Sequence, residues 1–284
     1  MFLYSSYTVP VPFLRYLSVW CPLGVRLWYC LFGRNVYLCS LANLVSMYEK
    51  TQAIVLSAFK YKDNSLIVRC FTEEFAAQSY LLKGVLSSGK GKLRPALFQP
   101  LTLLEVVATH KHHEGLEYIK EARLLTVYQS LHTDIYKSAV TLFLAEVISG
   151  VCVSDHRDIE LFSFIKERLL YFDRMPFSAN FHLKFLLEMT RYLGFYPDTT
   201  EADLPYFNLE EGHFDSIDDR KYTISGDVLV LFTSLLAADD RDLPAIKATK
   251  VLRNRLLELL LKYYQWHFPA FKPIKSLEVL QMLF

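Results

Sequence analysis

Lysines and glycines gather between residues 83 and 94, where the residue types and their spacing could bind phosphate. The segment carries Lys83, Lys90, Lys92 and Arg94. From Gly84 onward it matches seven positions of the phosphate-loop pattern G-x-x-x-x-G-K-[ST], but Gly91 stands where a Mg²⁺-binding hydroxyl is required. The segment also leads into a predicted strand, not into a helix whose N-terminus could hold phosphate. We therefore expect a flexible basic loop that follows a nucleic-acid backbone, with a solvent-exposed hairpin loop as the alternative.

A second cluster has the residue types of a metal site. It reads His110-Lys111-His112-His113-Glu114. On a strand His110 and His112 share a face while His113 points away, and Gly115 ends the run, so a polar turn is the simpler interpretation. A basic hairpin tip that touches nucleic acid through Lys111 is favoured over metal binding. The chain has five cysteines and no C-x-x-C pair, so the sequence predicts no metal site and fits a reducing compartment.

Aromatic residues near the basic loop could stack on bases. They are Phe59, Tyr61, Phe71, Phe75, Tyr80 and Phe98. Most are expected in the interior of a small barrel, which side chains must fill. Tyr61 is singled out because Lys60 and Lys62 flank it, and both lysines join the list of candidate DNA-binding residues.

The net charge of +1 hides an uneven distribution. Residues 47–112 hold nine Lys and Arg against five Asp and Glu, and residues 113–284 hold nineteen against twenty-five. A basic segment followed by an acidic one indicates a polyanion-binding face on the first. Chance variation in surface charge remains the alternative.

Short strand-like runs joined by polar turns position these side chains. We expect strands at 50–57, 65–71, 75–82, 96–109 (bent near Pro100) and 116–125. In the first, Ile54 and Leu56 share one face and Ala53 and Val55 the other. Five such runs predict an OB-type barrel over residues 47–128.

From residue 133 onward, apolar residues recur every three to four positions, which is the spacing of a helix. Helices are expected at 133–151, 158–172, 178–193, 226–238, 249–267 and 276–284, with Gly194 as a C-terminal glycine and Ser276 as an N-cap. These form an all-α domain over 129–284, and the fold class is α+β. An acidic insert, 197–220, reads as a loop. Residues 1–46 lack a clean apolar span, and we expect them to be a misassigned or poorly ordered extension that precedes a start at Met47.

The first part of the chain also holds an ordered set of short segments. It includes the run from Lys50 to Leu56, the segment Tyr61-Lys62-Asp63-Asn64-Ser65, Leu82-Lys83-Gly84, and Leu97-Phe98-Gln99-Pro100. This set resembles the RecO family of bacterial recombination mediators. Arg255, Tyr263, His267 and Lys275-Ser276-Leu277 are similar to the far end of the family, so the resemblance covers residues 47–284. One departure is that many members carry a four-cysteine zinc module where this chain has its cysteine-free acidic insert.

The resemblance implies a non-enzymatic DNA repair and recombination protein without a cofactor, in the cytoplasm at the nucleoid and not at a membrane. Such proteins bind single- and double-stranded DNA, anneal complementary strands and, with RecR, help load RecA onto DNA coated by single-strand-binding protein. The positions that fit the DNA-binding residues are Lys60, Lys62, Lys83, Lys90, Lys92, Arg94 and Lys111. Two other hypotheses stay open: an adaptor whose barrel binds a partner peptide and, ranked last, a nucleotide hydrolase that uses the 84–91 loop.

Overall fold

The computed structural model describes residues 48–86, 93–110, 116–153, 156–218 and 222–283, together with the backbone of 15–20, 26–32 and 35–39. The chain divides into two compact units, 1–47 and 48–284. In the first, β1 (Arg15–Trp20), β2 (Arg26–Phe32) and β3 (Asn35–Cys39) form an antiparallel sheet in that order. Whether the natural chain starts at Met47 stays a prediction.

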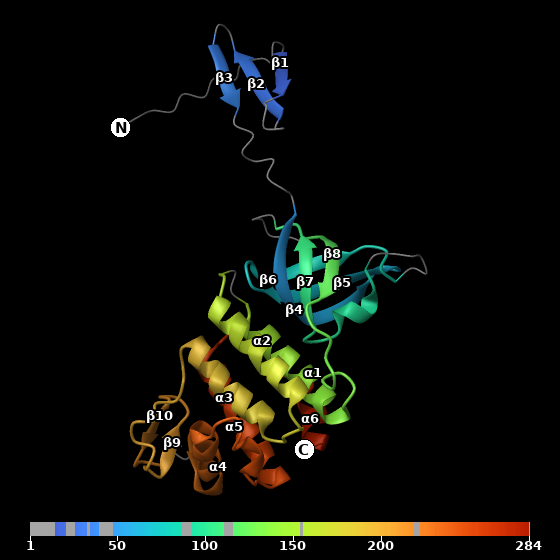
Figure 1. The fold of residues 1–284 in the computed structure, drawn as a ribbon. Helices are drawn as coiled ribbons and strands as arrows, with labels where there is room; N and C mark the ends of the chain where they lie inside the picture. The colour runs from blue at the N-terminus through green and yellow to red at the C-terminus, as the bar shows by residue number, and fades with distance from the viewer. Residues whose placement is uncertain are drawn as a thin grey trace, which may run out of the picture. The chain divides into compact units, whose positions relative to one another are not determined.

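A five-stranded antiparallel sheet begins the second unit and confirms the OB-type fold (Figure 1). Its strands are β4 (Glu49–Tyr61), β5 (Ser65–Thr72), β6 (Ala76–Leu82), β7 (Leu103–Ala108) and β8 (Ile119–Leu124), in the order β6-β5-β4-β7-β8. No regular ladder joins the edge strands β6 and β8 within the described residues. A single bridge from Tyr80 to Glu117 spans this seam, supported by a hydrogen bond from Leu81 N to Glu117 O at 2.7 Å.

The prediction of one continuous strand over 96–109 is wrong for the first half of that range. Residues Pro95–Phe98 form a 3₁₀ helix, η1, and β7 begins only at Leu103. Pro95 has its φ fixed near the helical value, and Pro100 has no N–H to give to a ladder, so neither favours a strand interior. Phe98 is nevertheless buried inside the barrel.

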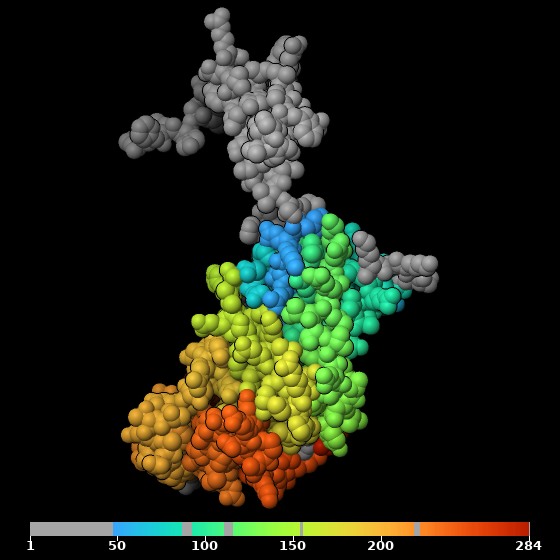
Figure 2. Space-filling view, viewed as in Figure 1, coloured from blue at the N-terminus to red at the C-terminus, as the bar shows by residue number. Residues whose placement is uncertain are grey.

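The two faces of β4 enter two different cores, as its alternation predicts. Ile54 and Leu56 pack with the helices, while Ala53 and Val55 line the barrel interior with the buried free thiol of Cys70. The helices share the first core directly, because Phe71 on β5 meets Phe162 at a ring-centroid distance of 5.8 Å. In the space-filling view the barrel and the helices pack against each other without a gap (Figure 2).

In the described part of the chain beyond the sheet, six α-helices lie where the period predicts them. They are α1 (Ile135–Val151), α2 (Ile159–Arg174), α3 (Phe181–Leu193), α4 (Gly226–Ala237), α5 (Lys250–His267) and α6 (Leu277–Leu283). Gly194 ends α3 at a φ of +85°, the left-handed conformation that glycine adopts without a Cβ penalty. Ser276, expected to cap α6, lies directly before it: its carbonyl accepts from Leu280 N at 3.1 Å, and its hydroxyl donates to Glu146 of α1 at 2.7 Å. No helix in the described parts is long and apolar enough to cross a membrane.

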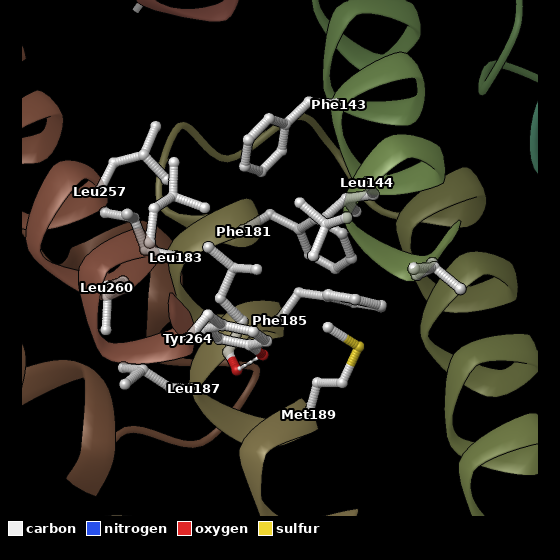
Figure 3. Close-up of a cluster of buried hydrophobic side chains, with 14 of the residues drawn as sticks. Phe143, Leu144, Phe181, Leu183, Phe185, Leu187, Met189, Leu257, Leu260 and Tyr264 are labelled. Atoms are coloured by element: carbon white, nitrogen blue, oxygen red, sulfur yellow. Dashed lines mark hydrogen bonds between the residues drawn. The ribbon is translucent and has the colours of Figure 1, made fainter. Parts of the chain in front are cut away.

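Large side chains from α1, α3 and α5 fill the helical core (Figure 3). Tyr264 is fully buried there and donates its hydroxyl to Leu186 O at 2.7 Å, so its polar atom is satisfied. The labelled residues around it include Phe143, Phe181, Phe185, Met189 and Leu260.

The acidic insert is not only a loop, which corrects the expectation for 197–220. It begins a small sheet of β9 (Tyr206–Asn208), β10 (His213–Asp215) and β11 (Thr223–Ser225), in the order β10-β9-β11. Each strand buries only its central residue, and three residues are too few to show a period of two in the sequence. Phe207 contacts Phe214 and Phe232 at centroid distances of 5.1 and 4.6 Å, so aromatic packing anchors the insert beside α4 (Figure 1).

Candidate nucleic-acid interface

The turn between β4 and β5 presents the first predicted cations. Lys60 pairs with Leu66 and Tyr61 with Ser65, so the hairpin ladder holds the backbone of both residues up to the turn. Lys60 and Lys62 are exposed, and Lys62 Nζ lies 5.4 Å from the centre of the Tyr61 ring. Tyr61 keeps 37% of its surface accessible, so the turn offers two cations and one ring to solvent.

Lys83 lies next to this turn, although it is more than twenty residues away in the chain. The segment after β6 turns at Gly84, with a φ of +68°, and Leu86 N then donates to Asn64 O at 3.1 Å. That hydrogen bond fixes the start of the basic loop against the β4–β5 turn. Lys83 is exposed, with its Nζ 4.9 Å from the centre of the Tyr118 ring, and Arg94 is exposed just before η1.

These four cations differ in their ion pairs from Lys50 and Arg123, two other basic residues of the barrel. Lys50 binds Glu105 at 2.7 Å, Arg123 binds the same carboxylate, and Glu74 takes Arg157 of the helical region at 2.8 Å. Among the described residues, by contrast, no carboxylate forms an ion pair with Lys60, Lys62, Lys83 or Arg94. Their charge is therefore available to a polyanion without breaking a described salt bridge.

Three predicted DNA-binding residues lie outside the described residues. They are Lys90 and Lys92 of the basic loop and Lys111 of the hairpin that follows β7. The structure brings Lys83 and Arg94, the residues that flank the loop, to the exposed surface of the barrel, and the positions of these three stay predictions.

His110, the described histidine of the predicted metal-like cluster, has a structural role instead. Its ring stacks on Phe75 with centroids 3.7 Å apart, and its Nε2 lies 2.8 Å from the Tyr80 hydroxyl. Burial lowers the pKa of His110 to about 4, although the nearby Glu117 opposes this shift, so the ring is neutral at physiological pH. Across the described ranges, no group of three or more His, Cys, Asp or Glu could hold a metal ion, while His112 and His113 lie outside them.

Sequence reasoning missed a second set of exposed rings and cations, at the start of β8. Tyr118 is 39% exposed, and Lys120 Nζ lies 5.2 Å from the centre of the Tyr48 ring. In the structure residues 117 and 119 are buried and 118 and 120 exposed, which is the alternation of a strand, but the buried residue 117 is a glutamate, so the polarity of the residues gave no signal for which face is exposed. Of the aromatics that were considered, Tyr80 and Phe98 are buried in the barrel as expected, Phe71 is buried against the helices instead, and Phe59 is 52% exposed.

Comparison with known proteins gives one consistent family. A model described as the N-terminal part of recombination protein O matches residues 47–128, and one described as its C-terminal part matches 132–278. The chain is 42% identical to the DNA repair protein RecO of Christiangramia forsetii over 234 residues, which cover 82% of this chain and 98% of the relative. For the RecO proteins of Flavobacterium johnsoniae and Bacteroides fragilis the identities are 39% and 34%, each over 84% of this chain and 100% of the relative. The chain belongs to the RecO family of DNA repair proteins.

Proposed function

We propose that this protein binds single- and double-stranded DNA at the cationic edge of its barrel. It then anneals complementary strands and, with RecR, helps load RecA onto DNA coated by single-strand-binding protein, at the nucleoid and without catalytic chemistry of its own. Membership in a family of DNA repair proteins supports this role. The observation that carries the DNA-binding step is the set of exposed cations, Lys60, Lys62, Lys83 and Arg94, that no described carboxylate neutralises.

The physical basis of the proposal is counterion release. DNA is surrounded by condensed cations, and each lysine or arginine that contacts a phosphate sets such ions free. Affinity then falls with salt by a slope of about 0.7 per phosphate contact for a single strand on logarithmic axes. Four contacts would account for a slope of roughly −3, with Lys90, Lys92 and Lys111 adding to it.

The test is binding of a fluorescent oligo-dT strand, and of a duplex of equal length, across a salt series by fluorescence anisotropy. Replacing Lys60, Lys62, Lys83 and Arg94 by Ala should lower affinity at low salt by tenfold or more and flatten the slope by about 3. The matched control replaces four exposed cations of the helical region, Arg241, Lys247, Lys262 and Lys272, and thus makes the same change in net charge. Equal losses in the two variants would show a general charge effect and contradict the assignment.

The adaptor hypothesis makes the opposite prediction about salt. A partner peptide held mainly by apolar contacts stays bound at high ionic strength, whereas contacts to DNA phosphates weaken. Annealing is followed separately, by the rate at which two complementary labelled strands pair. We expect the four-residue variant to lose this acceleration in step with its affinity.

A further inference from the structure

Two tyrosines, each with a lysine over its ring, extend the cationic edge across the barrel seam. Lys83, just after β6, covers Tyr118, just before β8, and Lys120 of β8 covers Tyr48, just before β4. Only the first pair spans the seam, where the Tyr80–Glu117 bridge joins β6 to the residues just before β8 in the described parts of the chain. The second pair crosses β7, which lies between β4 and β8 in the sheet.

We propose that Tyr118 and Tyr48 form a base-stacking track that makes this protein bind unpaired DNA more tightly than paired DNA. The inference rests on the proposed DNA binding and deepens it. The cations provide contact with phosphate in any DNA, whereas the two rings recognise bases that only a single strand exposes. We call this set, Lys83, Tyr118, Lys120 and Tyr48, the seam track.

The seam track continues from the β4–β5 turn without a break in the described contacts. Asn64 of the turn binds Leu86, three residues beyond Lys83, and Lys83 reaches Tyr118 across the seam. On the far side of β8, Glu49 pairs with Ala108 and Ala108 with Ile119, which brings the beginning of β4 close to Tyr118 and Lys120. A strand that enters over Tyr61 can therefore pass Tyr118 and leave at Tyr48.

Tyr118 is held in place before any ligand arrives. Its N–H donates to Thr109 Oγ1 at 2.9 Å, and its carbonyl accepts from Thr109 N at 3.0 Å. Thr109 Oγ1 in turn donates to the buried carboxylate of Glu117. A backbone fixed on both sides lowers the ordering cost that a stacking residue would otherwise add on binding.

The lysine over each ring does not block the track, because the exchange favours the base. An exposed cation–π contact changes an equilibrium by about 2- to 5-fold, whereas stacking of a base on an aromatic ring contributes about 5- to 150-fold. When a base displaces the ammonium group, a phosphate of the same strand lies within reach of the flexible lysine stem. The lysine then contacts a phosphate in place of the ring, and the ring contacts a base in place of the lysine.

The experiment measures the affinity of the full chain for three ligands of equal length: oligo-dT, the same backbone with abasic sites, and a duplex. Tyr118→Leu should weaken oligo-dT binding about 5- to 150-fold and leave the other two within about twofold. Tyr48→Leu should have a smaller effect of the same kind, since Tyr48 is less exposed. Tyr118→Trp should restore oligo-dT binding, which a general folding defect would not allow. The control is Tyr136→Leu on α1, where the ring is 44% exposed and stacks on Phe177 of the helical region.

The possible outcomes separate this inference from the function on which it rests. If the unaltered protein binds none of the three ligands, the proposed DNA binding is wrong and the seam track with it. If it binds all three in a salt-dependent way but Tyr118→Leu changes no affinity, only the seam track is wrong. Equal losses on oligo-dT, abasic strand and duplex would also overturn it, because they would assign Tyr118 a structural role.

Discussion

Cations of the barrel edge and two cations enclosed among the helices, Arg168 and Lys184, have opposite surroundings. Lys60 and Lys83 are exposed and without an ion pair to a described carboxylate. Arg168 of α2 lies among the helices and donates to both oxygens of Asp240 at 2.6 Å, while the buried Lys184 donates to Leu235 O at 3.0 Å. A buried charge must be satisfied by the protein itself, whereas an exposed one can take its partner from solution. The difference indicates which charges hold the fold and which can bind a ligand.

Lys137 and Asp173 show most clearly a pair of charged groups whose hydrogen-bond partners are all supplied by the protein. The Lys137 ammonium donates to Ser130 Oγ, Asp173 O and Met175 O at 2.6 to 3.0 Å. The Asp173 carboxylate accepts the N–H groups of Gln129, Ser130 and Leu131 at 2.8 to 2.9 Å. These amides belong to the segment that joins the sheet to the helices, so one carboxylate fixes the course of the chain between them.

Removing that carboxylate should give the largest effect on stability. Asp173→Ala leaves three amides, including that of the buried Leu131, without their acceptor and removes a negative charge near Lys137. We expect a loss of about 4 kcal/mol in the free energy of unfolding, measured by urea titration. Glu167→Ala on the exposed face of the same helix is the control, and it should stay within about 0.5 kcal/mol. Similar losses in the two variants would contradict the distinction between the two classes of charge.

Replacing Arg168 by Lys tests geometry at constant charge. Lysine cannot form the two parallel hydrogen bonds to Asp240, so we expect a loss of about 2 kcal/mol from the same titration. Arg174→Lys, at the exposed end of α2, is the matched control and should change little. A stable Arg168→Lys variant would mean that charge alone suffices at this position.

The barrel also contains a titratable residue with a structural role, His110, which the fold keeps neutral. Its pKa is about 4 in the folded chain, below the unfolded value near 6.5, so the unfolded chain binds the extra proton first. Stability should therefore decline as pH falls from about 6.5 to 4, by on the order of 1–2 kcal/mol for this partly exposed group. His110→Gln should flatten the pH profile of the urea midpoint in that window. An unchanged slope would show that other groups, such as the buried His182, cause the decline.

The cations of the barrel edge should contribute least to the free energy of unfolding, although they should contribute strongly to DNA affinity. Replacing Lys60, Lys62 and Lys83 together by Ala should move the urea midpoint by less than the equivalent of about 0.5 kcal/mol, since no described ion pair is lost. The same protein sample serves for the oligo-dT titration. A marked loss of stability would show that these cations are structural, like Arg168.

The order of residue types along the chain predicted the parts of this fold that depend on the spacing of apolar residues or on one backbone position. The two faces of β4, the six helices and the end of α3 at Gly194 all follow from the order of apolar and glycine residues. The 3₁₀ segment at Pro95 was missed because a buried Phe98 looks the same in a strand. The short strands around Phe207 were missed because one buried residue in three carries no period.

The candidate site was only partly predictable, for a different physical reason. Lys60, Lys62, Lys83 and Arg94 could be found because clusters of cations are visible along the chain. The contacts that define the seam track join residues far apart in sequence, such as Lys83 with Tyr118 and Lys120 with Tyr48. The acceptor for the amides of Gln129 to Leu131 is likewise more than forty residues away. Such pairings depend on tertiary packing, which no local pattern specifies.

Strand β4 places neighbouring residues in two cores, Ile54 among the helices and Val55 inside the barrel. If either core lost its packing, the β4 backbone would no longer be held in position for the other core. The second unit should therefore unfold in one cooperative transition. A ligand that binds only the folded barrel then stabilises the helices as well, by mass action. DNA held at the barrel edge would thus protect α3 and α5 from hydrogen exchange without touching them.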